Sequence, residues 1–87
     1  MAQQITADEI REFAYNHYVF PARNAGLPQV RIRAGDVHDA LNLVSLYPAV
    51  CGALGADKFQ TQYRLRRIGR QGPTSGANVW FTFEIFP

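Results

Sequence analysis

The chain has 87 residues and a formal net charge of +2, and 47% of its residues are hydrophobic, with six Phe, four Tyr and one Trp. This apolar content is too high for a disordered segment and predicts one folded domain over residues 1–87, with a single small core. No apolar run reaches the ~20 residues that cross a bilayer, and the first residues are polar and acidic, so we expect a cytoplasmic location and no membrane partner.

The first predicted element is a helix that begins after Thr6. Thr6 and Glu9 have the spacing of a capping box, in which each side chain accepts a hydrogen bond from the other residue's backbone N–H. Apolar residues then follow at helical spacing. We expect this helix to reach about Val19 and to end before Pro21, because a proline disfavours helical backbone in the residue before it.

The middle of the chain predicts one short strand and two helices. In residues 29–33, apolar residues alternate with arginines, which is the period of a half-buried strand. Residues 34–41 return to helical spacing, and a third helix over residues 48–56 can begin at Pro48, where a missing N–H costs nothing.

The last part of the chain predicts a β-hairpin over about residues 61–86. Apolar and polar residues alternate after Phe59, on both sides of a loop over residues 69–78 that is rich in Gly, Pro and Asn. The odd-numbered residues of the final strand are all apolar, so we expect this face to lie in the core: Val79, Phe81, Phe83 and Ile85.

The expected order of elements is helix, strand, helix, helix, strand, strand, which makes an α+β fold. This order resembles the winged helix-turn-helix fold, in which three helices pack on a small antiparallel sheet and a C-terminal hairpin forms the wing. The resemblance covers nearly the whole chain and rests on element order and length, since the superfamily has no diagnostic residue string. It implies a helix-turn-helix at about residues 36–56, a wing at about residues 61–86, and DNA binding in transcriptional regulation or in targeting to DNA.

Basic residues concentrate in the predicted hairpin. Residues 1–57 carry four basic and six acidic side chains, whereas residues 58–87 carry five basic side chains and one acidic one. A local positive field attracts polyanions, so we expect double-stranded DNA as the partner. The hairpin residues expected to contact phosphates or the minor groove are Arg64, Arg66, Arg67 and Arg70. Further contacts are expected from the first strand and from around the third helix: Arg31, Arg33, Ser45, Tyr47 and Lys58.

The third helix itself is poor in side chains that read bases. Guanine is usually read by Arg or Lys and adenine by Asn or Gln, and none of these lies on that helix. We therefore expect recognition of the DNA backbone or shape more than of base sequence.

Other interpretations of the same residues remain open. The arginines could form a solvated strand face, with Arg64 and Arg66 opposite Glu84 and Thr82. The chain could instead be a protein-interaction module with a winged-helix fold, such as a phage or mobile-element protein that binds a host complex. A third alternative is the targeting domain of a larger DNA-processing enzyme.

Trp80 and Phe86 share the even-numbered face of the final strand. They could anchor a partner or a second copy of the chain, so that the protein is either a monomer or a homodimer. Alternatively, Trp80 packs against the stems of Arg64 or Arg66 in a cation–π contact.

No constellation of residues points to catalysis. There is one cysteine, Cys51, and no pair of nearby histidines, so no spacing suggests a metal site, and residues 69–76 lack the lysine of a phosphate-binding P-loop. We expect a protein that is not an enzyme and has no cofactor or metal, with Cys51 as a small buried side chain.

Overall fold

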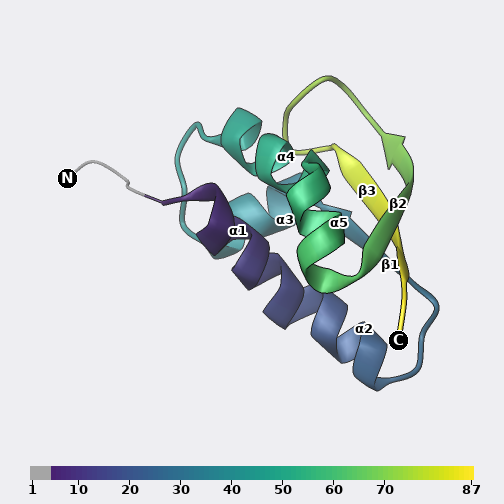
Figure 1. Cartoon of the computed structure of the whole chain (residues 1–87). Coiled ribbons are helices and arrows are strands. Elements are labelled where there is room, and N and C mark those ends of the chain that lie inside the picture. Colours follow the sequence, from purple (N-terminus) through teal and green to yellow (C-terminus); the bar gives the residue numbers. More distant parts are fainter. Residues whose placement is uncertain (1–4) are drawn as a thin grey trace.

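A computed structural model describes residues 5–87, so residues 1–4 of the expected domain lie outside the described part. Figure 1 shows helices packed against one face of a three-stranded antiparallel sheet. The expected α+β class is confirmed. Within residues 5–87, no helix combines the length and the apolar character needed to cross a membrane.

The N-terminal helical segment is continuous and has three parts, α1 (Ala7–Ala14), η1 (Tyr15–Val19) and α2 (Phe20–Asn24). The predicted capping box is present, because the Glu9 backbone N–H donates to Thr6 Oγ1 over 3.1 Å and the Thr6 N–H donates to Glu9 Oε1 over 3.0 Å. The start of the helix is therefore fixed by local sequence.

The prediction that this helix ends before Pro21 is wrong. The segment η1 has π-helical turns, in which the Phe20 N–H donates to the carbonyl oxygen of Tyr15, five residues earlier. A proline ring inside a regular α-helix collides with the carbonyl group four residues before it. The wider π turn immediately before Pro21 accommodates the ring, and the chain stays helical to Asn24.

The remaining elements follow in the order strand, three helices, strand, strand. They are β1 (Gln29–Arg33), α3 (Ala34–Ala40), α4 (Tyr47–Gly55), α5 (Asp57–Tyr63), β2 (Leu65–Gln71) and β3 (Trp80–Ile85).

The helix α5 was not predicted, and the hairpin accordingly begins at Leu65 instead of about residue 61. Contacts with distant residues determine that this segment is helical. The buried ring of Phe59 packs edge-on against Phe83 with 5.2 Å between ring centroids, and the Tyr63 ring stacks on Tyr15 at 4.4 Å. Arg64 then reverses the chain into β2 with left-handed backbone, φ 55°.

The strand order is β1-β3-β2, so β3 is the central strand. Val30 pairs with Phe83 and Ile32 with Phe81, and these four residues face the helices on what we call the inner face of the sheet. The opposite, outer face carries the alternate residues: Gln29, Arg31, Arg33, Arg66, Gly69, Gln71, Trp80, Thr82 and Glu84.

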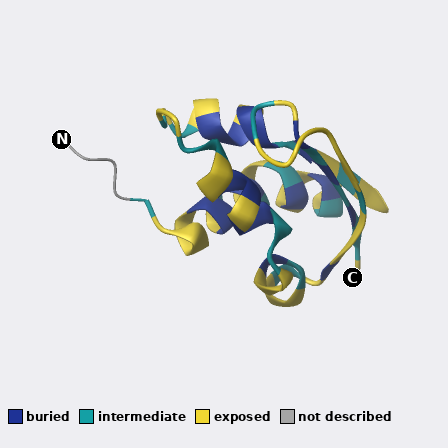
Figure 2. Cartoon of the chain, turned by 90° about the horizontal axis from the view of Figure 1, so that it is seen from above, coloured by how far each residue is buried: buried dark blue, intermediate teal, exposed yellow. Residues whose placement is uncertain are grey.

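The core lies between the inner face and the helices. As expected from the alternation, Val79, Phe81 and Phe83 are buried and Ile85 packs partly buried against them. Figure 2 shows buried stretches of the helices and the sheet facing one another, with exposed stretches outside. The core also contains residues from α1, η1, α3, α4 and α5: Ile10, Val19, Val37, Val50, Leu54 and Phe59.

The hairpin loop folds back onto the helices. The Ala77 carbonyl oxygen accepts a hydrogen bond from the Gly35 N–H over 2.9 Å, and Asn78 Oδ1 accepts one from Arg33 Nη2 over 2.8 Å. The thiol of Cys51, buried as predicted, lies 3.8 Å from the Gly76 carbonyl oxygen. The loop after β2 is thereby held beside α3 and α4.

Candidate nucleic-acid interface

The sheet separates the hairpin arginines onto two faces. Arg66 pairs with Glu84 on the outer face, whereas Arg67 pairs with Phe83 and Arg70 with Phe81 on the inner face. Positions 67 and 70 would face opposite sides of a regular strand, because side chains alternate. A β-bulge between Arg67 and Gly69 inserts one extra residue and brings Arg67 and Arg70 to the same side.

Both inner-face arginines are held by backbone carbonyl groups. Arg67 Nη1 donates to the carbonyl oxygen of Gly55, the last residue of α4, over 2.9 Å. Arg70 Nη2 donates to the carbonyl oxygens of Pro73, over 2.9 Å, and Thr74, over 2.6 Å. Each guanidinium has five N–H donors, so these contacts fix the side chains and leave donors for a ligand.

A hollow of about 340 Å³ lies between α4 and the hairpin loop, beside these arginines. Cys51 of α4 and Phe81 of β3 line it, and Thr74 and Ser75 line it from the hairpin loop. No acidic residue lines it. The complete lining is Pro48, Cys51, Gly52, Gly55, Arg67, Arg70, Thr74, Ser75 and Phe81.

The surface of α4 beside the hollow is made of small residues. Gly52 is exposed, and a Cβ built on it would meet no atom within 4 Å. The fold therefore does not require glycine at this position, although glycine inside a helix costs about 1 kcal/mol relative to alanine. Because Gly52 has no side chain, another molecule can approach the helix backbone closely.

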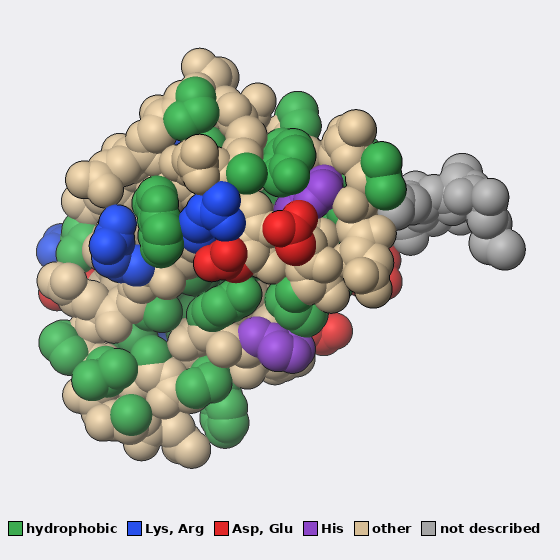
Figure 3. Space-filling model, turned by 180° about the vertical axis from the view of Figure 1, so that it is seen from behind, with side chains coloured by type: hydrophobic (Ala, Val, Ile, Leu, Met, Phe, Trp, Pro, Cys, Tyr) green, Lys and Arg blue, Asp and Glu red, His purple; other side chains and the backbone are tan. Residues whose placement is uncertain are grey.

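The outer face contains a second group of basic residues. The Arg31 guanidinium carbon lies 4.5 Å from the centre of the Trp80 ring, and Arg31 Nη2 lies 3.4 Å from Gln71 Oε1. Arg33 donates to Asp36 over 2.9 Å. Figure 3 shows this side of the molecule, where a hydrophobic side chain lies between two basic ones with acidic side chains nearby. Trp80 thus packs against Arg31, not against Arg64 or Arg66.

The alternative interpretation is a solvated strand face, with Arg64 and Arg66 opposite Glu84 and Thr82. The structure agrees with it only for Arg66, which pairs with Glu84. Arg66 Nη2 lies 2.8 Å from Glu84 Oε1, in an ion pair without the alignment of a hydrogen bond. Arg64 lies outside the strand, in the turn after α5, and so it does not face Thr82.

The other predicted contact residues do not line the hollow. Ser45 is exposed in the loop between α3 and α4, with φ 55°. Tyr47 begins α4 and stacks on His38 with 3.9 Å between ring centroids. Lys58 Nζ lies 2.9 Å from Asp8 Oδ1. Hydrogen bonds from Lys58 and Arg11 hold the pKa of the Asp8 carboxyl below its usual value.

Trp80 and Phe86 do not form one aromatic patch. Trp80 begins β3 and Phe86 follows its last residue, and six strand positions correspond to about 20 Å. Trp80 belongs to the outer face, whereas Phe86 borders a separate pocket at the end of the sheet.

Sequence reasoning missed the hollow. From the sequence, Gly52 and Gly55 are only parts of a predicted helix, and Thr74 and Ser75 are only parts of a predicted loop. The available signal was the absence of any charged residue between Asp39 and Asp57, which leaves α4 with an uncharged surface beside a basic strand.

Within residues 5–87, no group of three or more His, Cys, Asp or Glu side chains is arranged to hold a metal ion. Comparisons of the chain with models of protein families, with curated proteins and with solved structures found no match.

Proposed function

We propose that this protein binds duplex DNA through the face formed by α4 and the β2–β3 hairpin, in the manner of a winged-helix domain. The observation that carries the proposal is the position of Arg67 and Arg70. Both lie beside the exposed surface of α4, in a hollow that no acidic residue lines. The acidic residue of the hairpin, Glu84, lies on the opposite face of the sheet.

The same geometry favours contact with the sugar–phosphate backbone. Guanidinium groups match phosphate oxygens, and the hydroxyl groups of Thr74 and Ser75 add donors of the kind that contact phosphates. The exposed residues of α4 are small and cannot read base edges: Pro48, Ala49 and Gly52. The protein would therefore act by backbone or shape recognition, either in transcriptional regulation or in targeting another factor to DNA, and not as an enzyme.

The salt dependence of binding measures how many arginines take part. Two phosphate contacts give an affinity that falls about 12-fold between 50 and 200 mM salt, whereas four contacts give a fall of about 150-fold. Because the sheet places Arg67 and Arg70 alone of the hairpin arginines in the hollow, we expect the smaller value.

The decisive experiment compares two double variants with the same change in charge. Fluorescence anisotropy with a mixed-sequence duplex is measured for Arg67→Gln with Arg70→Gln, and for Arg31→Gln with Arg66→Gln on the outer face. The variant at Arg67 and Arg70 should lose most of the affinity for DNA and show a weaker dependence on salt. The variant at Arg31 and Arg66 should bind DNA within about threefold of wild type. Circular dichroism spectra and urea midpoints establish that both variants are folded.

Two results would contradict the proposal. If wild type shows no binding at tens of micromolar protein in about 50 mM salt, duplex DNA is not the ligand. If the variant at Arg31 and Arg66 loses as much affinity as the variant at Arg67 and Arg70, the protein binds DNA but the assigned face is wrong.

A second candidate function is that of a protein-interaction module. It is favoured by the outer face, where Trp80 and Arg31 lie together on a sheet surface that the helices leave uncovered. An aromatic ring and an arginine are typical of the residues that dominate protein interfaces. Absence of DNA binding by wild type would favour this candidate.

A further inference from the structure

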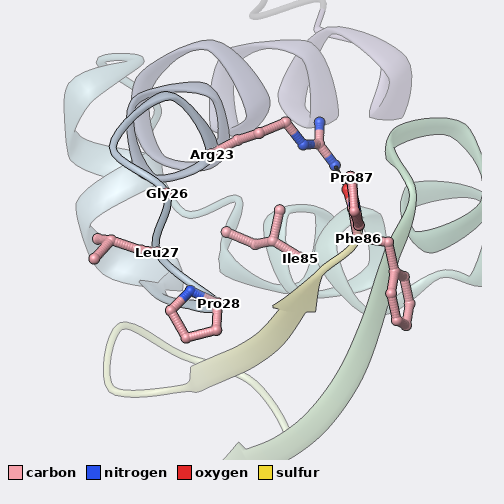
Figure 4. Close-up of a pocket in the computed structure, with 7 residues that line it drawn as sticks. All are labelled: Arg23, Gly26, Leu27, Pro28, Ile85, Phe86 and Pro87. Atoms are coloured by element: carbon pink, nitrogen blue, oxygen red, sulfur yellow. Dashed lines mark hydrogen bonds between the residues drawn. The ribbon is translucent and has the colours of Figure 1, made fainter.

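A second pocket lies at the end of the sheet where β3 finishes. It has a volume of about 220 Å³ and lies between the end of α2, the loop that leads to β1, and the last residues of the chain. Figure 4 shows Arg23 along one side, Leu27 and Pro28 on the other, and Ile85 between them, with Phe86 at the edge and its ring directed away from Arg23. It shares no lining residue with the hollow beside α4.

Arg23 brings a positive charge to this pocket. Its Nη2 atom donates to the carbonyl oxygens of Tyr63, over 2.6 Å, Arg64, over 3.3 Å, and Phe86, over 3.1 Å. These contacts tie the end of α2 to the end of α5, to the turn before β2 and to the residue that follows β3. The guanidinium therefore has a fixed position before any ligand arrives.

Among the described residues, Arg23 donates through Nη2 alone. Its Nε atom is buried and has no hydrogen-bond partner in the described part of the chain. Buried donors in native proteins almost always have a partner, which can be protein, water or a ligand. An unpaired N–H on a cation is best satisfied by an anionic oxygen, since charge-assisted hydrogen bonds are the stronger ones.

The other walls are apolar and partly open. Leu27 and Phe86 are 52% and 40% exposed, and the lining contains no acidic side chain to neutralise Arg23. Large apolar side chains beside a fixed cation suit a molecule that has an apolar body and one negative group.

We propose that this pocket binds a small molecule with one carboxylate and an aliphatic or aromatic body. The carboxylate pairs with the guanidinium of Arg23, and the body packs against Leu27, Pro28 and Ile85. A volume below the ~300 Å³ of typical ligand pockets limits the body to about the size of a six-carbon chain or one aromatic ring. This binding is independent of DNA.

The test is a titration of the whole protein followed by ¹H–¹⁵N NMR in the absence of DNA. The probes are hexanoate and benzoate, with hexanol and benzyl alcohol as uncharged counterparts. The acids should bind with dissociation constants of about 0.1–1 mM and shift the amide signals of Leu27, Ile85 and Phe86. The alcohols should bind at least about tenfold more weakly, because they lack the charge that Arg23 attracts.

Leu27 provides a matched pair of variants that leaves the contacts of Arg23 intact. Leu27→Glu places a carboxylate at the pocket rim and should weaken acid binding at least about tenfold relative to the neutral Leu27→Gln. Absence of acid binding up to about 10 mM, alcohols that bind as well as acids, or equal binding by the two variants would each overturn the proposal. Since no DNA is present, this result stands apart from the DNA-binding test.

Discussion

The backbone N–H of Gly35 donates to the carbonyl oxygen of Ala77 over 2.9 Å. A Cβ built on Gly35 would lie 2.8 Å from that oxygen and 2.9 Å from the Ala77 Cβ. Glycine is therefore needed at the start of α3, because only a residue without a side chain lets the hairpin loop approach this closely. The contact sets where the loop lies relative to α4, and hence the shape of the hollow.

We expect Gly35→Ala to destabilise the protein by about 1–3 kcal/mol, because the loop or the helix must move to accept the methyl group. The matched control is Gly52→Ala, whose new methyl group meets no atom within 4 Å. That change should stabilise the helix by up to about 1 kcal/mol. Urea denaturation of both variants checks the pair, and equal effects would show that the contact with Ala77 does not constrain the loop.

The Thr6 cap makes a separate contribution to the first helix. Thr6→Ala removes the acceptor of the Glu9 N–H and should cost about 1 kcal/mol. Thr61→Ala, an exposed position within α5, is the control and should stabilise the protein by up to about 0.7 kcal/mol, because alanine has the higher helix propensity. Thermal denaturation followed by circular dichroism measures both, and a silent Thr6 variant would mean that the cap does not limit stability.

His38 fixes the loop between α3 and α4. Its Nε2 atom accepts the Leu46 N–H over 3.2 Å while its ring stacks on Tyr47. His38→Phe keeps an aromatic ring but removes the acceptor, so we expect a loss of about 1–2 kcal/mol in urea denaturation. His17→Phe, at an exposed position, is the control and should cost less than about 0.5 kcal/mol.

The carboxyl group of Asp8 makes part of the stability depend on pH. Hydrogen bonds from Lys58 and then Arg11 lower its pKa in the folded chain relative to the unfolded chain. A lowered folded-state pKa stabilises the protein above the unfolded value, near pH 4, and this contribution disappears as pH falls through the folded value.

Asp8→Asn should therefore be less stable than wild type at neutral pH, and the difference should shrink as the pH falls below about 4. Because Asp8 is exposed, the effect should be small. Urea midpoints measured from pH 7 to about pH 2.5 check this, with Glu12→Gln as the control. A constant difference between Asp8→Asn and wild type across this range would contradict the assignment.

Several parts of the fold follow from local sequence alone. The capping box at Thr6 predicts where the first helix starts, and the alternation of Val79, Phe81 and Phe83 predicts which face of the last strand is buried. These patterns depend on neighbours within a few residues, and so they can be read without knowledge of the rest of the chain.

Other parts depend on contacts between distant segments. Pro21 stays within a helix because the preceding turn is π-helical, and α5 forms because Phe59 and Tyr63 find partners on β3 and on the first helix. Neither the π-helical turn before Pro21 nor α5 has a local sequence pattern that distinguishes it from a helix end or from a strand.

The positions of the hairpin arginines likewise depend partly on local sequence and partly on the tertiary structure. The sequence by itself determines that basic residues dominate after Asp57 and that they accompany a strand. Only the tertiary structure decides which face each of them occupies, because the extra residue at Ile68 reverses the facing of every later residue of β2. That single bulge places Arg70 beside Arg67 over the hollow, where simple alternation would have placed it on the outer face with Arg66.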